Sequence, residues 1–92
     1  MPLNLEEALR LLAAGVRDAF DRQILDPTHP DRGALVRADF GIADPAGSIG
    51  LPTLAALLLV ARRLGHPTPD APDDATAIER AGLAMDYCLR AL

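Results

Sequence analysis

The chain has 92 residues, half of them apolar but only 3% aromatic, so any core must be built mainly from Leu, Ala, Val and Ile. Its formal net charge of −4 argues against a nucleic-acid partner, because phosphate binding requires a basic surface. Cys88 is the only cysteine, which excludes an intrachain disulfide and a cysteine-based zinc site.

The first residues, MPLNLEEALRLL, contain two acids and no basic segment followed by an apolar core. This pattern is not that of a signal peptide, so we expect a cytoplasmic location.

A first helix is predicted over residues 4–25. Asn4 is a suitable N-cap, and Glu7 stands three residues later, as in a capping box. Pro27 disfavours the helical conformation of Asp26, which should end the helix near residue 25. One face of this helix is apolar at steps of three and four residues: Leu5, Leu9, Leu12, Val16 and Phe20.

Residues 26–50 read DPTHPDRGALVRADFGIADPAGSIG and contain three prolines and four glycines, which break a helix. A short strand or two could form within residues 34–42. A stretch of about 25 residues without regular structure is long for a compact domain, and such loops are usually functional or disordered. We expect an ordered loop pinned onto the helices, because it holds many apolar side chains: Leu35, Val36, Phe40, Ile42 and Ile49.

A second helix is predicted over residues 51–64, with Pro52 in its first turn and Gly65 after its end. Residues 54–61 are apolar without a break, so protein should cover most of this helix. Eight apolar residues fall far short of the roughly 20 that span a bilayer, and we therefore expect no membrane segment.

A third helix is predicted over residues 74–92, after a Pro- and Asp-rich connector. Asp73 or Asp74 could cap it, and Thr76 with Glu79 offers a competing capping box. It should form an αα-hairpin with the second helix, and the first helix should pack against that hairpin. The expected fold is therefore all-α: a single helical unit over residues 1–92, with three helices and the long ordered loop.

His29 is the first candidate for chemistry, because carboxylates and Arg32 stand near it in DPTHPDRG. A histidine among carboxylates can act as a general base or a metal ligand. The alternative is that the polar side chains of this segment only cap turns.

Arg37 and Asp39 are two residues apart, so they would share one side of an extended segment. Together they could bind a sugar or a carboxylate substrate, or they could simply pair with each other. No catalytic triad, metal-ligand spacing or phosphate loop can be assembled from the chain, and no cofactor is expected.

The order of these parts resembles the opening of six-hairpin (α/α)6-toroid proteins, which include glycoside hydrolases and heparinase II/III-like polysaccharide lyases. In this sequence the resemblance covers roughly residues 17–65: DRQILDPTHPDRG is followed by an all-apolar helix. The matching positions are Arg22, Gln23, Asp26, Pro27, Pro30 and Gly33.

The resemblance implies that this chain is the N-terminal helical segment of a carbohydrate-active toroid protein and is inactive alone. No catalytic residue of the family maps onto it, so whether the chain is part of an enzyme stays open. The loop would lie at the rim of the toroid, which makes His29, Arg32, Arg37 and Asp39 candidate substrate-binding residues. The partner would be the rest of a larger chain. The alternative is a small self-contained helical protein that homodimerises or binds a protein partner through an exposed apolar helix face.

Overall fold

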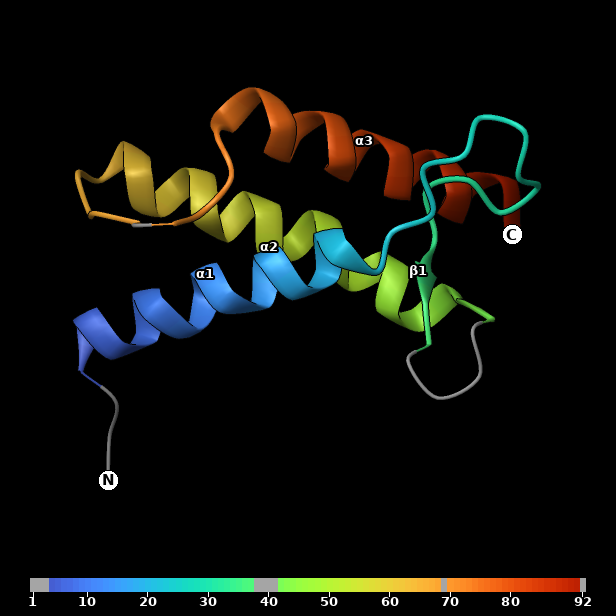
Figure 1. The fold of residues 1–92 in the computed structure, drawn as a ribbon. Coiled ribbons are helices and arrows are strands. Elements are labelled where there is room, and N and C mark those ends of the chain that lie inside the picture. Colours follow the sequence, from blue (N-terminus) through green and yellow to red (C-terminus); the bar gives the residue numbers. More distant parts are fainter. Residues whose placement is uncertain (1–3, 38–41, 69, 92) are drawn as a thin grey trace.

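The computed structural model of residues 1–92 describes residues 4–37, 42–68 and 70–91. Its elements are helix α1 (Leu5–Asp21), strands β1 (Leu35–Val36) and β2 (Ala43–Asp44), and helices α2 (Pro45–Arg63) and α3 (Asp74–Ala91). Helices α2 and α3 run antiparallel as a hairpin, and α1 packs against α2 (Figure 1). The predicted all-α fold is confirmed.

Helix α1 begins where the sequence predicts but ends earlier. The side chain of Asn4 accepts a hydrogen bond from the Glu7 N–H at 2.7 Å, which confirms the cap. The helix ends at Asp21, not at residue 25. The Ile24 N–H bonds to the carbonyl of Ala34 at 2.8 Å instead of to a helical partner. Pairing with a distant segment therefore ends the helix before proline can.

Helix α2 begins at Pro45, so the predicted start at residue 51 is wrong. Pro45 occupies the first turn, and Pro52 lies inside the helix. Buried Ser48 explains the longer helix, because its hydroxyl donates to the Asp44 carbonyl at 2.6 Å and accepts from the Leu35 N–H at 2.8 Å. The hydrogen bond between Ser48 and Leu35 ties the start of α2 to β1. It offsets the poor helix propensity of the glycines and prolines in this part of α2.

The loop predicted over residues 26–50 is correspondingly shorter. Two short strands form in it, with Leu35 paired to Asp44 and Val36 to Ala43 in antiparallel register. β1 lies within the stretch where a strand was expected, whereas β2 follows that stretch.

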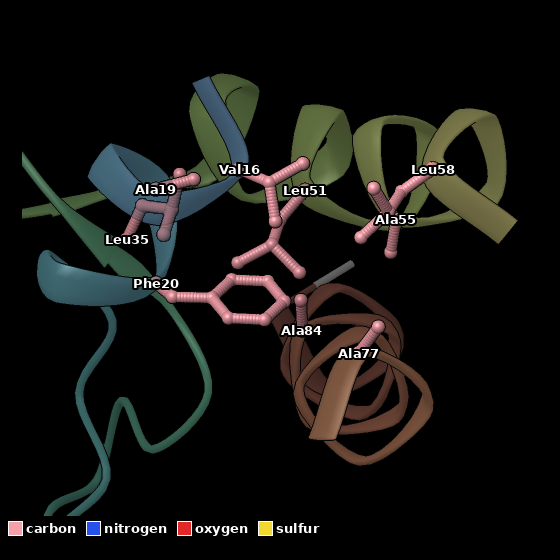
Figure 2. Packing of buried hydrophobic residues seen from close by; sticks show 9 residues of the cluster. All are labelled: Val16, Ala19, Phe20, Leu35, Leu51, Ala55, Leu58, Ala77 and Ala84. Atoms are coloured by element: carbon pink, nitrogen blue, oxygen red, sulfur yellow. The ribbon is translucent and has the colours of Figure 1, made fainter. Parts of the chain in front are cut away.

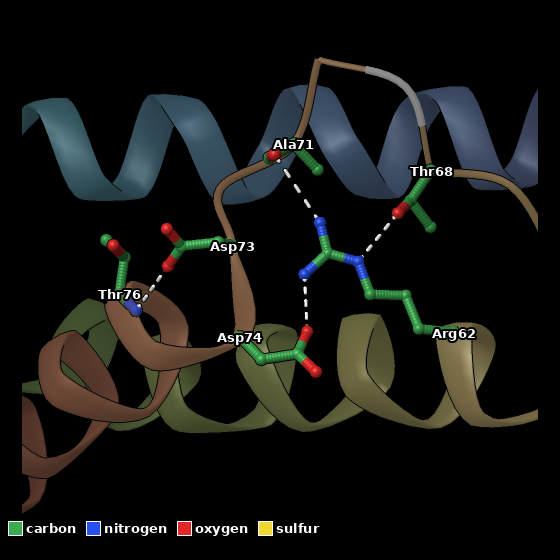
Figure 3. Close-up of polar contacts among 6 residues, drawn as sticks. All are labelled: Arg62, Thr68, Ala71, Asp73, Asp74 and Thr76. Atoms are coloured by element: carbon green, nitrogen blue, oxygen red, sulfur yellow. Dashed lines mark hydrogen bonds and ion pairs between the residues drawn. The ribbon is translucent and has the colours of Figure 1, made fainter.

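Helix α3 is capped by Asp73, whose carboxylate accepts the Thr76 N–H at 2.7 Å (Figure 3). The connector before it is held by one guanidinium. Arg62 donates from Nε to the Thr68 hydroxyl at 2.8 Å, from a terminal nitrogen to Asp74 at 2.7 Å, and to the Ala71 carbonyl at 3.4 Å.

The core lies where the three helices and β1 meet, and many of its side chains are small (Figure 2). Alanines of α2 and α3 let the two helices approach closely, and Phe20 of α1 fills the space toward Ala84. The cluster consists of Val16, Ala19, Phe20, Leu35, Leu51, Ala55, Leu58, Ala77 and Ala84.

Helix α2 is not covered on most of its surface by the described residues, contrary to expectation. Leu51 and Leu58 are fully buried, but Leu57, Val60 and Leu64 are 51%, 55% and 69% exposed. The helix has 19 residues, and its most apolar 18-residue window has a mean hydropathy of 1.4 and is only 28% buried. By length and composition alone this helix could span a membrane. Core helices of soluble proteins meet the same two criteria.

Candidate functional site

The loop that carries the predicted site residues is closed at its base by main-chain pairing. The Gly33 N–H bonds to the Ile24 carbonyl at 2.8 Å, and the Ile24 N–H bonds to the Ala34 carbonyl at the same distance. The residues between them therefore form a compact excursion beside α3 (Figure 1).

His29 lies exposed in this loop and caps a turn. Its Nδ1 accepts the Asp31 N–H at 3.0 Å. Asp26 forms a similar turn, with one carboxylate oxygen accepting both the N–H and the hydroxyl of Thr28 at 2.9 and 2.8 Å. These bonds lower the pKa of Asp26 below its ordinary value. These contacts are those expected if the polar side chains of the loop cap turns. The Nδ1 lone pair of His29 is already bonded to a backbone N–H.

Arg32 is half-buried at the point where the loop meets α3. Its Nε is buried without a hydrogen-bond partner among the described residues, and its carbonyl accepts a bond from Arg90 at 2.7 Å. Within the described part of the chain, no hydrogen bond or ion pair joins the side chains of Arg32 and His29. The Arg32 N–H bonds to the His29 carbonyl at 3.2 Å, and a substrate-binding role for the two side chains stays a prediction.

Arg37 follows β1 and is exposed, and its N–H bonds to the Ile42 carbonyl at 2.8 Å. Asp39 lies outside the described residues. The pairing of these two side chains stays a prediction.

The loop is fixed to α3 by side chains that the sequence analysis did not single out for binding. Buried Gln23 donates to the carbonyls of Gly33 and Arg80, both at 2.9 Å. Arg90, in the last turn of α3, donates to the carbonyls of Pro30 and Arg32 at 3.3 and 2.7 Å. In the sequence, the feature that could have indicated this docking is Gln23, a glutamine shortly before the proline-rich loop.

Gly33 is required at the closest approach of loop and helix. Its φ is +96°, and a Cβ at this position would collide with the carbonyl oxygen of Leu83 in α3. Four positions of the DRQ…DP…P…G pattern therefore have structural roles: Gln23 and Gly33 dock the loop, Asp26 caps a turn, and the Pro30 carbonyl accepts a hydrogen bond from Arg90.

No group of three or more His, Cys, Asp or Glu side chains that could hold a metal ion occurs in residues 4–37, 42–68 and 70–91. Cys88 is free and half-buried. The described residues thus contain no such candidate metal centre.

The most distinctive surface is on α2, on the side opposite its buried residues. We call it the outer face of α2. It carries no charged residue and presents apolar or small side chains at steps of three and four residues: Ala46, Gly50, Thr53, Leu57, Val60 and Leu64.

A hollow of about 470 Å³ borders this face on the α3 side, lined by Leu59, Val60, Arg62, Arg63, Asp74 and Ile78. Ile78 is 60% exposed, so the apolar surface continues from α2 onto α3. The continuous apolar run predicted a helix covered on most of its surface, whereas among the described residues only one side of it packs inside the chain.

A scan against protein-family models, a search of curated proteins and a search of solved structures each found no match.

Proposed function

We propose that this chain is a helical docking module that binds protein through the outer face of α2. The supporting observation is the exposure of Leu57, Val60 and Leu64 along one uncharged stripe. Exposed apolar side chains scattered singly are ordinary, but a continuous stripe indicates an interaction surface.

The charge distribution supports the same proposal. Helix α2 contains no acidic residue, although the whole chain has 13. An interface centre is typically depleted of charge, with polar groups at its rim. Arg62 and Arg63 stand at one end of the helix and suit such a rim.

The test is Leu57→Glu, which places a charge at the middle of the stripe without touching the core. Light scattering should find the wild-type chain above its own mass of 9.7 kDa, or an apolar fluorescent dye should bind to it. Either signal should vanish in Leu57→Glu, because burying an unpaired carboxylate is strongly unfavourable.

Leu11→Glu is the matched control. Leu11 lies on α1 and is 55% exposed, close to the exposure of Leu57. This variant should behave like the wild type. A wild-type chain that stays at 9.7 kDa and binds no dye would contradict the docking function.

The second candidate function is an N-terminal segment of a carbohydrate-active toroid protein. One observation favours it: α2 is apolar on two opposite sides, as a helix between two layers must be. Later helices of a larger chain would then cover the outer face. Titration with a uronic-acid oligosaccharide, followed by the ring NMR signals of His29, tests the proposed rim of the substrate cleft. Unchanged signals would argue against this candidate.

A further inference from the structure

We infer that the occupant of the outer face of α2 is a second copy of this chain, with the two α2 helices packed antiparallel across a twofold axis. This inference rests on the proposed docking function and names its partner.

The exposed residues of the outer face have the spacing of a helix–helix seam. Positions 46, 50, 53, 57, 60 and 64 alternate in steps of four and three, which is the seam spacing of helices that pack against each other along their length. Five of these six side chains are exposed, and Gly50 is half-exposed with nothing within 4 Å of a Cβ built on it. The seam is therefore present in this chain and open.

Side-chain size changes along the seam positions. The N-terminal three are small (Ala46, Gly50 and Thr53) and the C-terminal three are large (Leu57, Val60 and Leu64), while exposed Ile49 flanks the seam beside Gly50. In an antiparallel pair centred on Ala55, each large residue meets a small one of the other copy. Leu64 faces Ala46, Val60 faces Gly50, and Leu57 faces Thr53.

A parallel pair would instead place large residues against large ones at one end and leave voids at the other. Close packing with few voids is a requirement of stable protein interfaces. The seam is thus complementary to itself only in the antiparallel direction.

The positions of the charged residues also favour the antiparallel direction. Arg62 and Arg63 are the only charged residues of α2 and stand together at its C-terminal end. A parallel pair would bring four guanidinium groups side by side. An antiparallel pair in this register separates the two clusters by roughly 21–24 Å along the helices, at about 1.5 Å per residue. It also sets the helix dipoles in opposite directions.

The decisive experiment is disulfide cross-linking with single cysteines in a Cys88→Ala background. Ala46→Cys and Leu64→Cys are each purified, and one carries a mass tag. After oxidation, a mixture of the two variants should contain a disulfide-linked heterodimer. Neither variant oxidised alone should form a disulfide-linked homodimer. Cross-linking of either variant with itself would show parallel packing and overturn the inference.

Gly50→Leu tests the size pairing separately. An open position tolerates the new side chain in a single copy, and leucine favours helix more than glycine does, so helical circular dichroism should not fall. The added side chain would meet Val60 of the second copy. We expect the dimer dissociation constant, measured by light scattering over a concentration series, to rise at least tenfold.

Gly82→Leu is the control, because Gly82 lies on α3 and is equally open. Its dissociation constant should equal that of the wild type. A dimer that Gly50→Leu leaves unchanged would overturn the inference.

The wild-type chain separates failure of this inference from failure of the docking function. If the wild-type chain is monomeric and binds an apolar dye, and Leu57→Glu abolishes that binding, the second copy is excluded as the occupant. The proposed docking surface is then retained. A monomer without such dye binding would exclude both.

Discussion

Gln23 and Arg80 bond to each other in both directions across the gap between the end of α1 and the middle of α3. The Gln23 amide donates to the Arg80 carbonyl at 2.9 Å, and the Arg80 guanidinium donates to Gln23 Oε1 at 3.3 Å. The same guanidinium bonds to the Phe20 carbonyl and lies 5.4 Å from the centre of the Phe20 ring. This pair joins α1, the loop and α3.

Replacing Gln23 with Met, which has a similar shape and no donor, should destabilise the fold. Gln23 is buried, so the Gly33 carbonyl would lose the amide that it contacts. A buried polar group left without a partner costs about 1–3 kcal/mol. Urea denaturation followed by circular dichroism measures the loss.

Arg80→Met completes a double-mutant cycle. Because the two side chains contact each other, the double variant should lose less free energy of unfolding than the two single variants added together. Strict additivity would show that Gln23 and Arg80 do not act as a pair.

Gly33 and Gly82 should respond in opposite ways to alanine. Gly33→Ala forces a side chain into a positive φ and against the Leu83 carbonyl, and strain of this kind costs about 1–3 kcal/mol. Gly82→Ala, in the open middle of α3, should stabilise by roughly 0.5–1 kcal/mol. Thermal unfolding of the two variants gives the signs directly, and equal shifts would contradict the close contact at Gly33.

Local signals in the sequence predicted the parts of the fold that local chemistry decides. Asn4 caps α1 as expected, and Asp73, one of three candidates, caps α3. The start of α2 was missed because it depends on the Ser48 hydroxyl binding Leu35, a contact between residues 13 apart.

The loop residues were predicted as a group, but their roles depend on a distant helix. Nothing near Gly33 in the sequence announces that Leu83 lies against it, and nothing near Pro30 announces Arg90. The outer face of α2 could have been found from the sequence, because its large side chains recur at helical spacing on the side away from Leu51 and Leu58. An unbroken apolar run hides which side is covered.

Arg62→Lys should loosen the connector between α2 and α3. The planar guanidinium contacts Thr68, Ala71 and Asp74 at once, and an ammonium cannot reproduce that fork. Exposed ion pairs contribute only about 0.2–1 kcal/mol, so global stability should change little. Hydrogen exchange of the Ala71 amide should become several-fold faster. Arg63→Lys, at the exposed neighbouring position, should leave that rate unchanged.

The N-cap of α3 should make stability sensitive to acid. The Thr76 N–H and hydroxyl, both bonding to the carboxylate, lower the pKa of Asp73 below its ordinary value of 3.8. A carboxyl whose pKa is lower in the folded state stabilises the fold above its unfolded pKa, and that stabilisation is lost as the pH falls through the folded pKa. We therefore expect the free energy of unfolding to fall below about pH 4.

Asp73→Asn isolates this contribution. Asparagine also caps helices well but does not titrate in this range, so the variant should keep most of the stability at pH 7 and lose less of it on acidification. Asp74→Asn is the control, because Asp74 binds Arg62 and does not cap the helix. Urea denaturation of the three proteins at pH 7 and pH 3 makes the comparison. If Asp73→Asn loses as much stability between these pH values as the wild type, the Asp73 cap is not a source of acid sensitivity.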